Sequence, residues 1–465
     1  MKQYAKYMVL CLMILVSTAH SGCRKFIELG PPKTNLVSGQ VFATDATAIA
    51  ALSNIYHLLG ANGYAAGSFN SVTVISGFSA DEFESYTDAP DLNELYENNI
   101  LTKNGYVSSI WSDAYSMIYM TNALMEGLSK STTITKAVKD QLTGEALFIR
   151  AFTHFYLYNL FGDVPYITTT DYQVNTKASR LPVSEVGRLI INDLKLAKSI
   201  LNTDYDFFGK ERVRVNKWAA AALLARVYLY AGNWKDAAEE ASLVIAKSEL
   251  YEILPLEKVF LKNSKEALWQ IMPIDQGKNT KEGEMFVLDA KPVTLALNAD
   301  FANGFEAGDL RRGSWVGVYT KGAERWFYPF KYKIKYYGSP LEEYSMVLRL
   351  AEQYLIRAEA NAMLNLLPAA VKDVDVIRER AGLTKIAVLK PMIDKMGLLN
   401  VIANERKSEL FAEWGHRWLD LKRTGKIDEE LGHRKLEWLS TDALYPIPES
   451  QIKLNPFLIQ NPGYN

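Results

Sequence analysis

The chain has 465 residues, of which 48% are hydrophobic, and this is enough apolar content for the core of one large domain or two. Its formal net charge is −1, which gives no indication of a nucleic-acid partner, because such partners are bound through an excess of lysine and arginine. It has only two cysteines, Cys11 and Cys23, both near the amino terminus.

The first 22 residues have the three parts of a signal peptide. Lys2 and Lys6 make a basic start, residues 8–16 (MVLCLMILV) form an apolar block, and residues 17–22 are small or polar. The block is about half as long as the roughly 20 apolar residues that a membrane-spanning helix needs. We therefore expect residues 1–22 to be removed rather than kept as an anchor.

The predicted signal peptide ends in His20, Ser21 and Gly22, followed by Cys23, which resembles a bacterial lipobox. Ser21 and Gly22 are the small residues required beside the cut, whereas His20 replaces the usual aliphatic residue. We predict that the Cys23 thiol carries lipid. A single acyl chain gives only marginal membrane binding, so several chains on one residue would be needed to hold the protein to a membrane permanently, as expected for a lipoprotein. The alternative is an ordinary secretory peptide followed by a free cysteine.

Helical periodicity recurs along most of the chain. Residues 182–201 form an amphipathic pattern, and residues 217–248 have small residues, a tyrosine and a glycine at the offsets of a tetratricopeptide helix pair. Weaker copies of the pair occur at 111–163 and 350–383, and a last helical stretch covers 402–425. These units predict a mainly α fold, in which a curved scaffold of tetratricopeptide-like helix pairs carries long loop-rich and short β insertions.

Two regions break the helical period and mix glycine, asparagine, aspartate and aromatic residues with short apolar runs. Long insertions of this kind are usually functional, so we expect the binding surface there. The predicted organisation is a single domain over 23–465, with a helical scaffold at about 40–250 and 346–425, insertions at about 60–110 and 251–345, and an extended segment at 440–465.

The last third of the chain closely resembles the SusD/RagB family of outer-membrane nutrient-binding lipoproteins. The resemblance is carried by ERKSELFAEWGHRWLDLKRTG (405–425), followed by LYPIPESQIKLNPFLIQNPGYN (444–465). Other stretches agree in order along essentially the whole chain: CRKFIELGPPKTNL, EALFIRAFTHFYLYNLFGDVPYI, LPVSEVGRLIINDL, RVNKWAAAALLARVYLYAG, and YLIRAEANAML with IRERAGL.

The resemblance implies a SusD-like fold and a function in nutrient capture. It implies an oligosaccharide ligand and a SusC-like TonB-dependent transporter as partner, to which the captured glycan is delivered. It also implies a lipid-anchored protein at the outer membrane, facing the cell exterior.

Residues 301–337 contain eleven aromatic residues, where the overall content of 12% would place about four or five. A sugar ring stacks its C–H groups on an aromatic face and its hydroxyls need polar partners around the rim. Trp315, Tyr319 and Trp326 are therefore predicted to stack on the ligand. The alternative for residues 326–337 is a strand that packs one face of alternating aromatic residues into the core.

The insertion at 60–110 offers Tyr86, Asn98 and Asp81 as further ligand-binding candidates, because the resemblance implies a groove built from both insertions. A solvated loop position is the alternative for each of them. Asp309 and Arg311 in GDLRRG are predicted to form a structural salt bridge, although an arginine could also bind an acidic sugar.

No stretch of the sequence has a catalytic signature. There is no GxSxG motif or phosphate loop, and the five histidines have no metal-ligand spacing. We expect a binding protein without catalytic residues, cofactor or metal. The alternatives are a helical-repeat scaffold that holds a peptide partner and, less favoured, a glycoside hydrolase, which would need two carboxylates about 5 to 10 Å apart.

Overall fold

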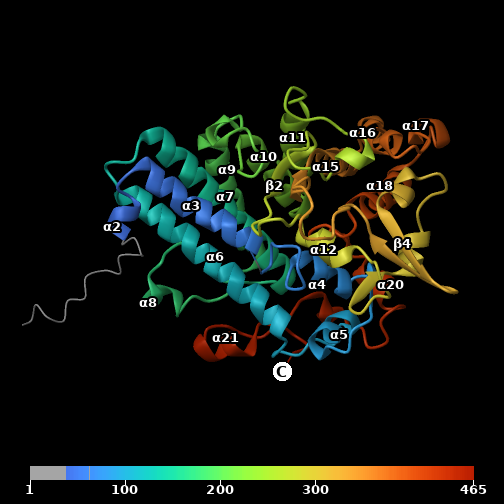
Figure 1. Ribbon diagram of the computed structural model, residues 1–465, viewed down its shortest axis with the longest axis horizontal. Helices are drawn as coiled ribbons and strands as arrows, with labels where there is room; N and C mark the ends of the chain where they lie inside the picture. Colours follow the sequence, from blue (N-terminus) through green and yellow to red (C-terminus); the bar gives the residue numbers. More distant parts are fainter. Residues whose placement is uncertain (1–37, 62, 465) are drawn as a thin grey trace, which may run out of the picture.

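The computed structural model describes residues 38–61 and 63–464 (Figure 1). The predicted signal peptide, 1–22, and the predicted lipid-attachment residue Cys23 lie outside the described residues. In the described part of the chain, no helix combines the length and the apolar character that a bilayer crossing requires.

Helices dominate the structure, so the predicted mainly α fold is confirmed. Successive long helices are neighbours: α6 packs on α7, α7 on α9, α9 on α10, and α10 on α11. Helix α11 then packs on α15, which also contacts α16 and α18. These scaffold helices are α3 (Asp45–Ala61), α6 (Gly105–Lys130), α7 (Lys136–Phe161), α9 (Val183–Ile200), α10 (Lys217–Tyr230), α11 (Trp234–Ile245), α15 (Leu350–Met363), α16 (Leu367–Arg380), α18 (Lys395–Leu410) and α19 (His416–Arg423).

The helix pair predicted over 217–248 is present as α10 and α11. The Asn216 side chain accepts two backbone N–H groups of the first turn of α10 and so caps its start. Every residue from Trp218 to Leu229 is buried, and the alanines among them let neighbouring helices approach closely. Gly232, at φ 74°, supplies the left-handed position after the helix. Local sequence therefore explains both the ends and the burial of this pair.

The shorter helices lie mainly in the insertions and connections. Those in the insertions have only five to eight residues, too few to show a helical period in the sequence. The α-helical ones are α2 (Ser38–Val41), α4 (Val72–Ser79), α5 (Pro90–Glu97), α8 (Tyr172–Asn175), α12 (Lys281–Phe286), α13 (Ala299–Asn303), α14 (Leu310–Ser314), α17 (Ile386–Leu389), α20 (Ile427–Leu431) and α21 (Glu449–Leu454), and the 3-10 turns are η2 (Asp206–Phe208), η3 (Leu256–Lys258) and η4 (Ser440–Ala443).

The two predicted insertions meet in one antiparallel sheet of order β1-β3-β5-β4. Its first strand comes from the insertion at 60–110 and the other three from the insertion at 251–345, and the labelled β4 lies at the far side of the molecule from α2 and α3 (Figure 1). A second sheet pairs β2 with β6. The strands are β1 (Phe83–Ser85), β2 (Ala267–Ile271), β3 (Leu295–Leu297), β4 (Val316–Lys321), β5 (Glu324–Pro329) and β6 (Ser345–Arg349).

A buried ion network joins the small sheet to the C-terminal helices. Nη1 of Arg349, at the end of β6, lies 3.1 Å from Glu266 Oε1 and also contacts the Glu409 carboxylate. The Arg349 Nε lies 2.9 Å from Glu413 Oε2. Nη1 of Arg311 lies 3.0 Å from the second oxygen of Glu409. Because these side chains are almost entirely buried, each charge depends on its partners for compensation.

We expect the substitution Arg349→Met to lower the free energy of unfolding by about 3–5 kcal/mol, because it removes from three buried carboxylates one of the cations that compensate them. Urea unfolding followed by circular dichroism measures the change. The matched control is Lys235→Met, since Lys235 makes an exposed pair with Glu239 at 3.8 Å and should contribute less than about 1 kcal/mol. An equal, small effect of both substitutions would contradict the structural role of the network.

Candidate functional site

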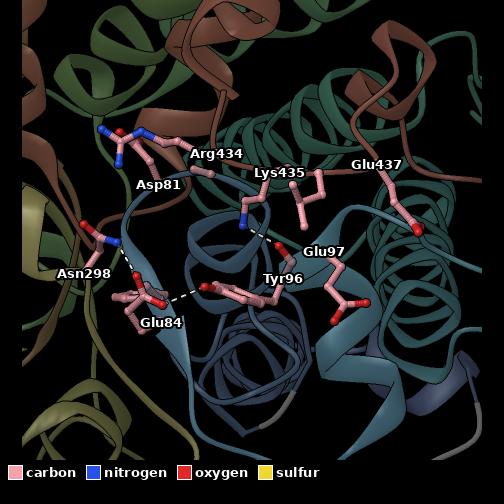
Figure 2. A pocket seen from close by; sticks show the side chains of 11 residues that line it. Asp81, Glu84, Tyr96, Glu97, Asn298, Arg434, Lys435 and Glu437 are labelled. Carbon is pink, nitrogen blue, oxygen red and sulfur yellow. Dashed lines mark hydrogen bonds between the residues drawn. The ribbon is translucent and has the colours of Figure 1, made fainter. Parts of the chain in front are cut away.

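A cavity of about 520 Å³ opens where β1, the end of α5 and the segment 434–437 meet (Figure 2). Its wall combines charged, polar and apolar side chains and draws on segments that are far apart in sequence. The lining residues are Ala80, Asp81, Phe83, Glu84, Tyr96, Glu97, Asn298, Arg434, Lys435, Leu436 and Glu437. Since both predicted insertions contribute to it, this pocket is the candidate ligand site.

Glu84 lies at the centre of the hydrogen bonds in the pocket. The Tyr96 hydroxyl donates to Glu84 Oε2 at 2.6 Å, and the Asn298 Nδ2 amide donates to Glu84 Oε1, as Figure 2 shows. The other end of the Asn298 amide accepts the backbone N–H of Phe301 and caps α13. Burial and the Glu84 carboxylate raise the pKa of Tyr96, so its hydroxyl stays protonated and keeps donating. The cap of α13 therefore positions Asn298 and helix α5 positions Tyr96, so that both donate to the carboxylate that β1 presents.

Asp81 lines the pocket, but its charge is taken up by cations behind the wall. Arg417 binds both of its oxygens, at 2.7 and 3.0 Å, and Lys407 lies at 3.5 Å. Burial by itself would raise the pKa of Asp81, but the hydrogen bonds and charge of Arg417 outweigh it and hold the pKa well below the usual range. The sequence-predicted Asp81 is thus in the site as an ion-paired wall residue.

Lys435 lines the cavity, but its ammonium group is bonded to the backbone. Its Nζ donates to the backbone carbonyls of Phe78, at 3.2 Å, and of Tyr96, and it lies 4.1 Å from the centre of the Tyr96 ring. Burial lowers the pKa of Lys435 to about 8. The lysine therefore holds the end of α5 in place rather than presenting a free ammonium group.

Three of the predicted aromatic candidates come together on the sheet beside the pocket. Tyr319 pairs with Trp326 across β4 and β5, and their ring centres are 6.0 Å apart. Burial raises the pKa of Tyr86, and the neighbouring Trp326 side chain opposes that rise. Tyr86 is 40% exposed, Tyr319 is partly exposed, and Trp326 is buried. We call Tyr86, Tyr319 and Trp326 the aromatic patch, and a stacking role for it stays a prediction.

Trp315 lies in the core, which corrects the expectation of an exposed stacking ring. It is fully buried, and its indole N–H donates to the Leu256 carbonyl at 3.1 Å. The Nζ of Lys331 lies 4.9 Å from its ring centre, on the buried ion network. A ring enclosed in this way has no face to offer a sugar. The sequence showed aromatic enrichment but could not show which rings face solvent.

Asn98 is also buried and has a backbone role. It ends α5 in the left-handed conformation, at φ 59°, and its Nδ2 donates to the Ser79 carbonyl at 3.0 Å. Asn98 thereby ties α5 to α4 behind the pocket and does not line it. The enclosed position of the Asn98 side chain argues against direct contact with a ligand.

The predicted salt bridge in GDLRRG is present: Arg311 Nη2 lies 2.7 Å from Asp309 Oδ2, and both side chains are buried. Arg311 is therefore not available to an acidic sugar. The alternative prediction for residues 326–337 was a strand. Only their beginning is a strand, because β5 ends at Pro329. Among the described residues, no group of three or more His, Cys, Asp or Glu side chains could hold a metal ion.

The pocket residues that sequence reasoning missed share one property. Glu84 lies in the short strand β1, and Asn298, Arg434 and Glu437 lie in short connections, so nothing in their immediate neighbours marks them. Glu84 and Asn298 are more than two hundred positions apart and meet only through the pairing of β1 with β3. The one available signal was that Glu84 and Asn298 lie in the two segments that break the helical period. Arg434 and Glu437 lie outside these segments.

Two family models match the chain. One, described as starch-binding and associating with the outer membrane, matches residues 38–229, and the other, described as the SusD family, matches residues 302–464. The chain belongs to the SusD/RagB family. Between them, the two matches include the insertion at 60–110, the part of the other insertion from residue 302 onward, and all the residues that line the pocket except Asn298.

Individual relatives agree with this family assignment. SusD-like protein P2 of Formosa agariphila is 29% identical, with all of both chains covered. A SusD superfamily protein from Bacteroides vulgatus has a TM-score of 0.80 at 20% identity, over 90% of this chain and 99% of its own. A laminarin-binding SusD-like protein has a TM-score of 0.76 at 22% identity, over 90% and 99% of the two chains. At these identities the two structures support the SusD fold.

We expect Trp315→Ala to lower the free energy of unfolding by about 3–5 kcal/mol, because it empties a large volume in the core. Thermal and urea unfolding measure this loss. Tyr337→Ala is the control, since Tyr337 is 74% exposed and should change stability by less than about 1 kcal/mol. A Trp315→Ala protein of unchanged stability that had lost ligand binding would place Trp315 at the ligand instead of in the core.

Proposed function

We propose that the protein captures an oligosaccharide at the Glu84 pocket and delivers it to a TonB-dependent transporter of the outer membrane. Membership of the SusD/RagB family supports carbohydrate binding as the class of function, and a binding role rather than a catalytic one. The observation that carries the proposal for this site is the meeting of the two insertions around Glu84.

The chemistry of the pocket suits a ligand that is rich in hydroxyl groups. Each sugar hydroxyl can donate one hydrogen bond and accept others, so it needs carboxylate, amide or guanidinium partners. The wall supplies Glu84, Asn298 and Arg434 for this purpose. The nearby Tyr86 ring, which is partly exposed, offers a face for the apolar side of a sugar.

The arrangement predicts weak binding. Much of the wall is exposed, so a sugar bound there would bury little area, and the lost freedom of a flexible oligosaccharide opposes binding. We propose dissociation constants in the micromolar to millimolar range, about −8 to −4 kcal/mol. Such affinities also suit a protein that must release its ligand to a partner.

Glu84→Ala should weaken glycan binding by about 1.5–3 kcal/mol, or roughly tenfold to a hundredfold, because it removes a charged acceptor and frees two donors. Isothermal titration against a panel of neutral plant, algal and microbial glycans, laminarin included, measures the effect. Glu252→Ala is the control, since this exposed glutamate lies outside the pocket and pairs only loosely with Lys265, at 3.7 Å. Failure of every glycan, neutral or charged, to bind the unmodified protein would refute the proposed function.

Membrane attachment and the transporter complete the proposal. Cys23 would carry the lipid that holds the protein at the outer membrane, facing the cell exterior, and one matching family model is described as associating with the outer membrane. A tether of this kind would keep the pocket close to a transporter in the same membrane and so raise the local concentration of ligand.

Cys23→Ala should move the protein from the membrane fraction to the soluble fraction without changing its unfolding temperature, because the predicted lipid would be attached ahead of residues 38–464, which form the described core. Fractionation and mass spectrometry of the amino terminus measure this. The unmodified protein, solubilised in mild detergent, should copurify with a barrel transporter. Membrane retention of Cys23→Ala would contradict the tether, and copurification of a soluble peptide partner alone would favour the scaffold alternative.

A further inference from the structure

The charged side chains that line the pocket differ in whether an oppositely charged group compensates them. Four carboxylates and two cations border the cavity, and most of their bonds are to other protein groups. The carboxylates are Asp81, Glu84, Glu97 and Glu437, and the cations are Arg434 and Lys435.

Three of the four carboxylates have no cation bound to them among the described residues. Glu84 accepts hydrogen bonds from two neutral donors, Tyr96 and Asn298. Glu437 accepts one from the neutral Asn99 amide at 2.9 Å, and Glu97 is exposed at the end of α5. Since neutral donors leave the charge of a carboxylate in place, these three groups give the cavity a negative potential.

The two cations offset only part of this potential. The Lys435 Nζ donates to the carbonyls of Phe78 and Tyr96, and its charge is attracted by Glu84, Asp81 and Glu97. Arg434 is exposed, and its guanidinium lies 3.6 Å from Asp300 Oδ2, which belongs to α13. Lys435 therefore holds the backbone, and Arg434 already faces Asp300. Asp81 is compensated separately by Arg417 and Lys407.

From this asymmetry we propose that the pocket selects by charge: it accepts neutral or amine-bearing glycans and rejects sulfated or uronate-bearing ones. Hydroxyl and ammonium groups can donate to Glu84, Glu97 and Glu437, whereas a sulfate or carboxylate can only accept. Bringing such an anion next to these carboxylates costs free energy, because like charges repel more strongly once water is displaced. The inference rests on the proposed glycan-binding function and names the substrate class of the same site.

The test compares each neutral glycan with its own chemically sulfated derivative, so that backbone and length are matched. Laminarin, dextran and starch oligosaccharides are titrated at low salt, together with chitosan oligosaccharides as the amine-bearing case. We expect each sulfated glycan to bind at least tenfold more weakly than its neutral parent. The difference should shrink as salt rises, because salt screens the repulsion.

A pair of charge variants separates the pocket from the overall charge of the protein. Glu97→Gln with Glu437→Gln should raise the ratio of sulfated to neutral affinity several-fold. Glu249→Gln with Glu252→Gln removes the same number of charges from exposed positions outside the pocket, so the ratio should stay unchanged. An equal change in both double variants would overturn the inference.

The outcomes distinguish this inference from the proposed function. Neutral binding with equal or tighter binding of the sulfated partners overturns the charge selection and leaves glycan capture standing. Binding of sulfated glycans alone has the same consequence. Failure of every neutral, sulfated and amine-bearing glycan to bind overturns both.

Discussion

The fully buried carboxylate of Glu409 is the group on which the C-terminal half of the structure depends. Arg311, Arg349 and Arg380 all bind it, and they come from α14, β6 and α16. Burial by itself would raise the pKa of Glu409, but the three guanidinium charges hold it well below the usual range. One negative charge therefore fixes the relative positions of the sheets, the scaffold and α18. Removing any one side chain from a buried network of this kind lowers the stability of the fold, because it leaves charges without full compensation.

The turn that follows Glu409 transmits this rigidity to the pocket. Ala412 and Trp414 have positive φ angles of 51° and 49°, an uncommon conformation for residues with side chains. Their backbone N–H groups donate to the Glu82 carboxylate at 3.2 Å and to the Thr73 hydroxyl at 2.9 Å. These bonds hold the first turn of α4 and the residue directly before β1. Arg417, a few residues further on, binds Asp81 in the pocket wall. The site is thus positioned by the buried network rather than by its own loops.

In the proposed function, the pocket offers hydrogen bonds and the aromatic patch offers a stacking face. In the pocket, donors such as Tyr96 and Asn298 converge on Glu84, so its side chains are held before a ligand arrives. Such preorganisation lowers the entropy cost of binding a flexible chain. Tyr86 lies on the continuation of β1, where its backbone N–H pairs with the Thr294 carbonyl at 2.8 Å, and the other two patch residues lie on β4 and β5. The pocket and the patch are therefore both built on one sheet.

The sequence by itself determined the features that depend on near neighbours. Helix periodicity and an asparagine cap are enough for α10 and α11, and contiguous motifs in the last third are enough for the family, because both are read within a few turns of chain. Only the tertiary structure decided which polar and aromatic residues form the site. Trp315 and Tyr86 are both aromatic residues of irregular segments, yet one is enclosed by the ion network and the other is open to solvent. Glu84 meets Asn298 through strand pairing, and exposure and long-range pairing are properties of the packed molecule that no local pattern contains.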